Sequence, residues 1–456
     1  MAVSPEQRRT AGPPASSLTL WLRRTGNSLA RPLFALLLAI IAGSIIIMIT
    51  SQGSLGDRFS SVLNAYQSLY IGSFGDPQKL SYTLVKVGPL ILAGLSVAIA
   101  FRAGLFNIGA QGQLAMGAMA AGAIGLSEPH WPGWVLIPLM VIASGLAGAV
   151  WGGIVGVLKA WRGAHEVVTT IMLNWIAFYF TDYLIQGPYK APNLPDQTFS
   201  LPPQATLPLI STLYNQTLGS FLPKIVYPTA YFVDVSFFAC LIALVFYWFI
   251  TKRMAFGYEI RVIGQNPKAA TYAGMPIKRN VVATMAIAGA FAGLAGSLHL
   301  MGQSPYQLIS NVFSSDQTGF DAIGVALLGR TTAVGILLGA LLFGGLRQGA
   351  SFMQLNAGIP NDLVLILQAL ILFSIASEFL PALQRILPGW MRVNRRPALA
   401  TNIVGPTAVV ELPVDRNAEE DELAAQEPPG VSPVVPRSKP ERVEEVDGSV
   451  DKHSEM

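Results

Sequence analysis

The sequence predicts an all-α fold, a polytopic transmembrane bundle of about nine or ten helices in which one is broken and another is a half helix. Of the 456 residues, 52% are hydrophobic and 12% are charged, whereas about 25% of the residues of an average soluble domain are charged. The chain carries 44 glycines, which allow helices to approach closely in lipid, where no hydrophobic force drives them together. These observations indicate a protein embedded in the lipid bilayer.

Segments long enough to cross a bilayer, about 20 apolar residues each, lie between residues 33 and 390, which we interpret as one transmembrane domain. The polar segment 1–32 precedes them, and the first apolar run lacks a convincing cleavage site, so it is expected to stay as an anchor. Spans are predicted near residues 33–50, 81–101, 105–126, 134–158, 167–186, 229–251, 280–301, 332–352 and 361–380, with a shorter segment at 319–329.

The segment 319–329 is too short to cross the membrane alone. We interpret it as a half helix that is capped by Asp316 or Asp321 and ends at Gly329 and Arg330. An acidic residue at the start of a helix would stabilise the free backbone N–H groups there.

Positive charge predicts the orientation of the bundle. Residues 252–279 contain six Lys or Arg residues and one acidic residue, Glu259, and loops with excess positive charge lie on the cytoplasmic side. Residues 187–228 are rich in proline and poor in Lys and Arg, so they are expected to form an extracytoplasmic loop. An even number of crossings then places both termini, including the segment 1–32, in the cytoplasm.

The C-terminal segment 391–456 differs in composition from the rest of the chain. Within it, residues 397–456 hold 13 acidic and 5 basic residues, and without apolar periodicity they cannot bury enough surface to fold alone. We predict a disordered acidic tail, with a docking or regulatory role as the less common alternative for such tails.

Phe101 to Gln113, FRAGLFNIGAQGQ, interrupt two apolar segments with glycines and polar side chains. Lipid cannot hydrogen-bond a free backbone group, so a break at membrane depth persists only where it packs in protein or faces a watery path. The break therefore predicts a chain that moves a solute.

The basic loop 252–279 contains a short helix whose two ends the sequence defines. Asn266 can cap a helix that begins at Pro267, and Gly274 lies where a left-handed C-terminal residue is expected. The residues between them include Lys268, Ala269, Ala270 and Tyr272. A rigid helix on a membrane face suits a partner's groove, although it could also contact only its own chain.

No pattern in the sequence predicts an enzyme. The phosphate-binding motif G-x-x-x-x-G-K-[ST] is absent and the dipeptide Gly-Lys does not occur, so ATP hydrolysis by that route must come from another subunit. With four scattered histidines and Cys240 as the single cysteine, we expect no metal site, no disulfide and no catalytic residues. The positive charge marks membrane topology, so nucleic-acid binding is not predicted.

Four segments carry a resemblance to a known family. In chain order they are FRAGLFNIGAQGQ, HEVVTTIMLNWIA from His165, GQNPKAATYAG from Gly264 and GFDAIGVALLG from Gly319. They resemble permease subunits of bacterial ABC importers in the branched-chain amino acid and simple-sugar superfamily, specifically the nucleoside-type branch, over about residues 80–380. The resemblance implies an ABC importer permease fold over residues 33–390, in the inner membrane, that translocates nucleosides.

The resemblance also implies partners. The helix around Pro267 would be a coupling helix that docks on a cytoplasmic ATPase, which would bind ATP and Mg²⁺, while this chain binds no cofactor. A lipoprotein would deliver the solute from outside, and a second, paralogous permease would complete a heterodimer. Lys268 replaces the glutamate of the general importer motif, as the nucleoside-type branch tends to have a basic residue there.

Within that family the broken segment lies near the translocation path, which makes Asn107, Gln111 and Gln113 candidates for its polar lining. Asn174 and Phe106 join them because a nucleoside is neutral and needs amides, hydroxyls and rings more than fixed charges. Related permeases usually have a glutamate at the position of Gln111, so an essential acid is not expected here. The alternatives are hydrogen bonding between helices for the amides and packing for Phe106.

Ionisable residues within or near the spans are expected to be paired or functional, because a charge in hydrocarbon costs about 3 kcal/mol or more. These residues are Lys86, Asp182, His299, Asp321, Arg347 and Glu378. Lys86, Arg347 and Glu378 are expected to pair or to extend towards the interface, and His299 is interpreted as a hydrogen-bonded interfacial residue. His165 and Glu166, at the start of a span, either cap it or shape an inner gate.

Two alternative functions remain open. The same fold could import branched-chain amino acids or simple sugars. A protein of another class, an ion-coupled secondary transporter or a channel, would favour intramembrane carboxylates and an inverted repeat, and the sequence has no clear repeat.

Overall fold

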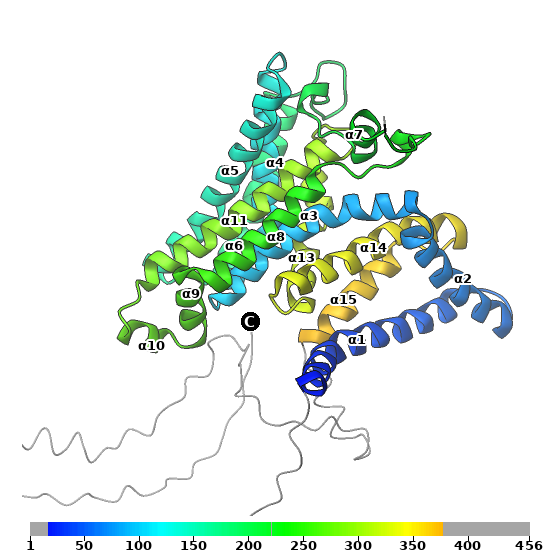
Figure 1. The fold of residues 1–456 in the computed structure, drawn as a ribbon, viewed down its shortest axis with the longest axis horizontal. Coiled ribbons are helices and arrows are strands. Elements are labelled where there is room, and N and C mark those ends of the chain that lie inside the picture. Colours follow the sequence, from blue (N-terminus) through cyan, green and yellow to red (C-terminus); the bar gives the residue numbers. More distant parts are fainter. Residues whose placement is uncertain (1–16, 220, 377–456) are drawn as a thin grey trace, which may run out of the picture. The chain divides into compact units, whose positions relative to one another are not determined.

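The computed structural model describes residues 17–219 and 221–376, with the side chains of the first helix described from residue 33 onward. These residues form helices, and no β-strand longer than an isolated bridge occurs among them. The all-α prediction is confirmed (Figure 1). The predicted acidic tail 391–456 and Glu378 lie outside the described residues.

The long helices are α1 Ser17–Thr50, α2 Leu55–Phe74, α3 Pro77–Arg102, α4 Ala110–Ser127, α5 Gly133–Arg162, α6 Glu166–Gln186, α8 Ser236–Arg253, α11 Ile277–Gly302 and α14 Ala333–Ala357. The shorter ones are α7 Ile210–Thr217, α9 Ala255–Gln265, α10 Pro267–Tyr272, α12 Val312–Ser315, α13 Thr318–Leu328 and α15 Asp362–Ala376, with 3₁₀ turns at Pro203–Ala205 and Pro228–Ala230. Among the described residues, 7 helices are long and apolar enough to cross a membrane.

Each predicted span contains a helix, but several boundaries differ from the prediction. Helix α4 begins at Ala110 rather than 105, α8 begins at Ser236 rather than 229, and α1 extends back to Ser17 into the predicted polar segment. Helix α2 was not predicted, because polar residues interrupt its apolar run. It is fixed locally by a capping box, in which Ser54 and Asp57 bond each other's backbone N–H groups.

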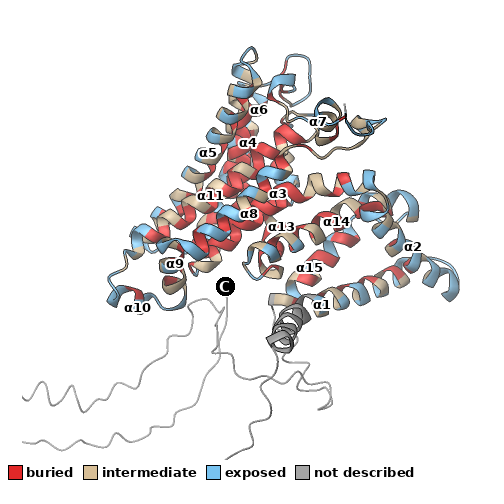
Figure 2. Cartoon of the chain, viewed as in Figure 1, coloured by how far each residue is buried: buried red, intermediate tan, exposed pale blue. Residues whose placement is uncertain are grey.

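Helices α3 and α11 form the centre of the bundle and are buried along most of their lengths (Figure 2). Helix α11 packs against α3, α4 and α5, and α3 packs against α13 and α14. At the crossing of α5 and α11, a Cβ atom at Gly289 would collide with the backbone of Gly148. The glycines therefore allow the close helix approach that the composition predicts.

Helix α3 changes direction along its length in Figure 1 and contains Pro89 in its interior. Proline lacks an N–H and clashes with the preceding turn, so it bends a helix. The N-cap residue of α3 is Asp76, whose carboxylate accepts the N–H of Lys79 at 2.8 Å. This hydrogen bond lowers the pKa of the Asp76 carboxyl.

Helix α13 is the predicted half helix. Its 11 residues span about 16 Å, half of a hydrocarbon core, and it ends at Gly329 as predicted. The predicted caps are wrong: Gln317 occupies the N-cap position without a side-chain cap bond, and Asp321 lies inside the helix. Both Asp316 and Asp321 are instead bound by Arg347, a long-range partner that outcompetes a local cap.

Candidate functional site

The break in the chain lies between α3 and α4, at Ala103–Gly109. Gly104 has a φ of +71°, and a Cβ there would come within 3.1 Å of the Cα of Gly264 in α9. The break thus packs directly on α9. The guanidinium of Arg102 donates to the hydroxyl of Tyr247 at 3.0 Å and to the carbonyl of Thr331 at 2.7 Å, which ties the end of α3 to α8 and to the end of α13.

Four buried amides lie in the break or on the helices beside it, and we refer to Asn107, Gln111, Gln113 and Asn174 as the amide network. Asn107 and Gln113 exchange two hydrogen bonds of 2.9 and 3.1 Å. Asn107 also donates to the hydroxyl of Ser96 and accepts the N–H of Gly109. These bonds replace the backbone pairing that the break removes.

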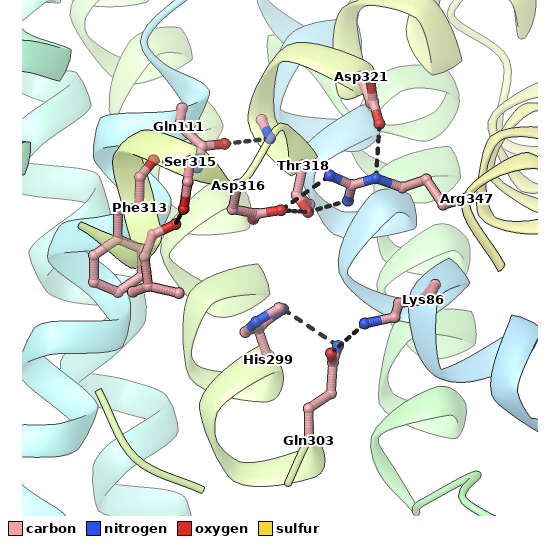
Figure 3. Close-up of polar contacts among 12 residues, drawn as sticks. Lys86, Gln111, His299, Gln303, Phe313, Ser315, Asp316, Thr318, Asp321 and Arg347 are labelled. Atoms are coloured by element: carbon pink, nitrogen blue, oxygen red, sulfur yellow. Dashed lines mark hydrogen bonds and ion pairs between the residues drawn. The ribbon is translucent and has the colours of Figure 1, made fainter. Parts of the chain in front are cut away.

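The other two amides bind the neighbouring helices. Gln111 donates to the carbonyl of Phe313 at 3.0 Å and accepts the N–H of Gly319 in the first turn of α13 (Figure 3). A glutamate in its ionised form could not donate to that carbonyl, which explains an amide at this position. Asn174 accepts the N–H of Gly112 and donates to the carbonyl of Ile108.

The members of the amide network are almost fully buried, and their donors and acceptors bind groups of this chain. Phe106 packs against Phe101, with ring centroids 5.1 Å apart. Of the two readings that the sequence left open, the geometry of these residues matches hydrogen bonding between helices and aromatic packing.

A second polar region, which we call the polar cavity, lies between α3, α11, α13, α14 and α15. Its volume is about 290 Å³, near the lower end of the range for small-molecule sites. Its lining consists of Lys86, Pro89, His299, Gln303, Asp316, Thr318, Arg347, Ala350, Ser351, Asn361, Val364, Leu365 and Gln368. None of the amide network belongs to it.

Arg347 forms one wall of the polar cavity (Figure 3). Its guanidinium contacts Asp316 at 3.0 Å and Asp321 at 3.2 Å, and donates to the hydroxyl of Thr318 at 2.7 Å. The predicted pairing of Arg347 is confirmed. Since a buried charge is costly without partners, these three contacts explain how an arginine is held in α14.

A directed chain of hydrogen bonds forms the opposite wall (Figure 3). Lys86 Nζ lies 3.0 Å from Gln303 Oε1, and Gln303 Nε2 lies 3.2 Å from His299 Nδ1. An ammonium group can only donate, so the amide oxygen faces Lys86 and the amide nitrogen must donate to His299. Neutral His299 therefore accepts at Nδ1 and carries its proton on Nε2.

Gln368 lies on α15 and is 4% exposed. Neither its amide oxygen nor its amide nitrogen has a hydrogen-bond partner among the residues that the structure describes. Buried polar groups are nearly always bonded, and each exception requires an explanation. The sequence interpretation missed Gln368 and Gln303, although a lone glutamine in the apolar run LVLILQALILF was a visible signal.

Helix α10 lies at the end of the bundle that also carries α9 (Figure 1). Asn266 accepts the N–H of Ala269 at 3.0 Å, Pro267 is the first helical residue, and Gly274 has a φ of +71°. The predicted capping is confirmed. Tyr272 is 92% exposed whereas Ala270 is fully buried, so Tyr272 is the large side chain that α10 presents outward, beside the exposed Lys268 and Ala269.

A shallow surface pocket of about 740 Å³ adjoins α10. Its lining is mostly apolar with two cations, and consists of Trp161, Thr271, Met275, Pro276, Ile277, Lys278, Arg279, Val282 and Ala283. This pocket joins the end of α5 to the start of α11.

Three other predicted residues lie outside the amide network and the polar cavity. His165 occupies the N-cap position of α6 but makes no side-chain cap bond, so the cap reading of this residue is wrong. Glu166 pairs with Lys159 at 2.8 Å, and Asp182 accepts the N–H of Asn311 at 2.7 Å. No cluster of three metal-ligating side chains occurs among the described residues.

Comparison with known proteins places this architecture in a family. Residues 79–376 match the family described as branched-chain amino acid transport system / permease component. The chain is 38% identical to the guanosine ABC transporter permease protein NupP of Bacillus subtilis over 349 residues, which cover 76% of this chain and 93% of that protein.

Two further relatives are similar over most of their length. The nucleoside ABC transporter permease protein NupB of Lactococcus lactis is 35% identical over 76% of this chain and 91% of its own. The glucose ABC transporter permease protein TsgB13 of Haloferax volcanii is 35% identical over 74% of this chain and 87% of its own.

Long apolar helices, a half helix and a polar cavity in the bundle define a multi-pass membrane protein of the transport class. The chain belongs to the branched-chain amino acid transport system permease family. It is a transport component of the inner membrane, as the sequence resemblance implied.

Proposed function

We propose that this chain is a transmembrane subunit of an ATP-driven importer for nucleosides. The observation that supports nucleosides as the transported solute is the similarity to the guanosine and nucleoside permeases over most of the chain. The polar cavity agrees with a neutral cargo. Its lining carries the charges of Lys86, Arg347 and Asp316, and Asp321 pairs with Arg347 from outside the lining. These four charges sum to zero when His299 is neutral.

ATP would be hydrolysed by a separate subunit, because the chain has no G-x-x-x-x-G-K-[ST] motif. The proposed docking element is α10 together with the adjoining pocket, where the exposed ring of Tyr272 and the cations Lys278 and Arg279 face outward. A helix capped at both ends transmits force without unravelling. By the positive-inside rule, this end of the bundle and both termini would face the cytoplasm.

The remaining partners would be a second permease and an extracytoplasmic lipoprotein. Bacillus subtilis has two proteins named guanosine ABC transporter permease, NupP and NupQ, and both are similar to this chain, at 38% and 28% identity. Two such subunits in one organism support a heterodimer here.

Reconstitution tests the proposal. The chain would be placed in proteoliposomes with its ATPase, second permease and lipoprotein, and uptake of guanosine, glucose and leucine would be measured with and without ATP. We expect guanosine uptake that depends on ATP. Uptake of glucose or leucine but not of guanosine would contradict the assignment of nucleosides as the cargo. ATP-independent uptake by this chain alone would contradict the assignment to ATP-driven importers.

Glucose is the second candidate cargo, because the Haloferax relative with that name is as similar as one of the nucleoside permeases. A sugar also requires hydrogen-bonding groups rather than net charge. A thermal-shift screen of the lipoprotein with nucleosides, sugars and amino acids distinguishes the two cargoes before any transport assay.

A further inference from the structure

We propose that the polar cavity is the binding site for the transported solute inside this subunit, and that Gln368 recognises it directly. This inference rests on the proposed function, and the ligand class is a neutral solute with hydrogen-bonding edges, such as a nucleoside. The site is built from one helical bundle and differs from the amide network next to the break.

The unpaired amide of Gln368 is the first argument. A buried donor and acceptor without partners cost free energy in the empty protein, and a bound solute that supplies both hydrogen bonds would recover that cost. A carboxamide offers one N–H face and one C=O face, which match the donor and acceptor pairs on a nucleobase edge. Leucine at this position would pack in the same volume without that cost.

The walls of the cavity provide the second argument. Arg347 is occupied by two carboxylates and a hydroxyl, so it is not available to bind an anion. Lys86 and Gln303 orient the ring of His299 so that its Nε2 carries a proton. The other hydrogen-bonding side chains of the lining remain to contact a solute, while Pro89, Val364 and Leu365 supply apolar surface. This mixture is typical of a small-molecule site.

Position along the bundle provides the third argument. Lys86 precedes Arg102, which lies at the α9 end, by 16 residues of α3, or about 24 Å of helix. The cavity therefore lies in the half of the bundle remote from α9 and α10. Pro89 lines it at the residue expected to bend α3, so the bend and the half helix α13 together make room within the helix packing.

The first experiment separates binding from folding. The Gln368→Leu variant of the assembled importer should unfold at the same or a higher temperature, because two unsatisfied polar atoms are removed. Its uptake of guanosine below saturation should fall about tenfold, the loss expected for one or two hydrogen bonds to the solute. Gln354→Leu, at an exposed position of α14, is the matched control and should keep wild-type uptake. Unchanged uptake in Gln368→Leu would overturn the proposal.

The second experiment uses the single cysteine of the chain. Cys240 is buried outside the lining of the cavity, so in the Gln368→Cys variant the thiol at position 368 is the one that a methanethiosulfonate reagent entering the cavity would modify. Guanosine should slow its modification, and it should not slow modification of the control variant Gln354→Cys. Uptake by the wild-type importer is measured first and identifies a transported solute. The protection assay then uses that solute.

The outcomes distinguish this inference from the proposed function. If glucose or leucine protected the thiol of Gln368→Cys and guanosine did not, the cavity would remain the binding site but the cargo would not be a nucleoside. Guanosine uptake by the wild type without protection of Gln368→Cys, or without any modification of it, would retain the cargo and overturn the site.

Discussion

The amide network and the polar cavity are both buried and polar, yet they differ in how completely their hydrogen bonds are satisfied. In the network, Asn107, Gln111, Gln113 and Asn174 bind groups of their own chain. In the cavity, the amide of Gln368 binds none among the described residues. A satisfied buried amide stabilises a fold, whereas an unsatisfied one is suited to a ligand.

The largest expected effect on stability comes from substitution of Arg347, whose guanidinium is bound by groups of its own chain. Arg347→Met leaves Asp316 and Asp321 buried without a counter-charge, which should lower the free energy of unfolding by about 3–5 kcal/mol. Thermal unfolding in detergent measures this loss. Arg330→Met, at an exposed arginine, is the control, and equal melting temperatures for the two variants would contradict the assignment.

A smaller loss is expected when Gln111 becomes an acid. Gln111→Glu places an ionised acceptor opposite the carbonyl of Phe313, where Gln111 now donates. The lost hydrogen bond and the unsatisfied carbonyl should cost about 1–3 kcal/mol of the free energy of unfolding. Thermal unfolding at neutral pH gives the measurement. A variant as stable as the wild type would show that Gln111 does not hold α13 in the way described.

Gln113 sharpens the comparison with Gln368 because the substitution is the same. Gln113→Leu removes both bonds to Asn107 and should destabilise the protein by about 1–2 kcal/mol, whereas Gln368→Leu should not. Melting temperatures of the two variants, measured side by side, test the difference. Loss of guanosine uptake in Gln113→Leu at unchanged stability would place the solute at the amide network instead.

The smallest effect on stability is expected at Tyr272. Tyr272→Ala removes an exposed ring and should change the free energy of unfolding by less than about 0.5 kcal/mol, yet it should lower ATP-driven uptake through weaker docking of the ATPase. Co-purification of the ATPase with the variant checks the cause. Ala270→Glu is a poorer test, because Ala270 is fully buried and the charge would disturb the loop itself. Full uptake with normal ATPase association would contradict the docking proposal.

Much of the fold follows from local features that a sequence displays. The spans follow from apolar length, the half helix from an apolar segment too short to cross the membrane, and α10 from Asn266, Pro267 and Gly274. Helix α2 was not predicted because polar residues interrupt its apolar run, although its capping box at Ser54 and Asp57 is a local signal in the sequence. The beginnings of α4 and α8 depend on tertiary packing rather than on composition.

The candidate site was harder to predict because its partners are distant in sequence. Arg347 contacts Asp316 and Asp321 across separate helices, so the local reading of both acids as caps was wrong. Lys86 meets Gln303 across 217 positions. A single amide such as Gln368 inside an apolar run gives no partner by itself, and only the packed bundle reveals that it has none.

A structure of the assembled importer trapped with guanosine tests the central claim most directly. We predict density for the nucleoside in the polar cavity, within hydrogen-bonding distance of the amide of Gln368, with the amide network unchanged. Density between the two permease subunits, or among Asn107, Gln111 and Gln113, would contradict it.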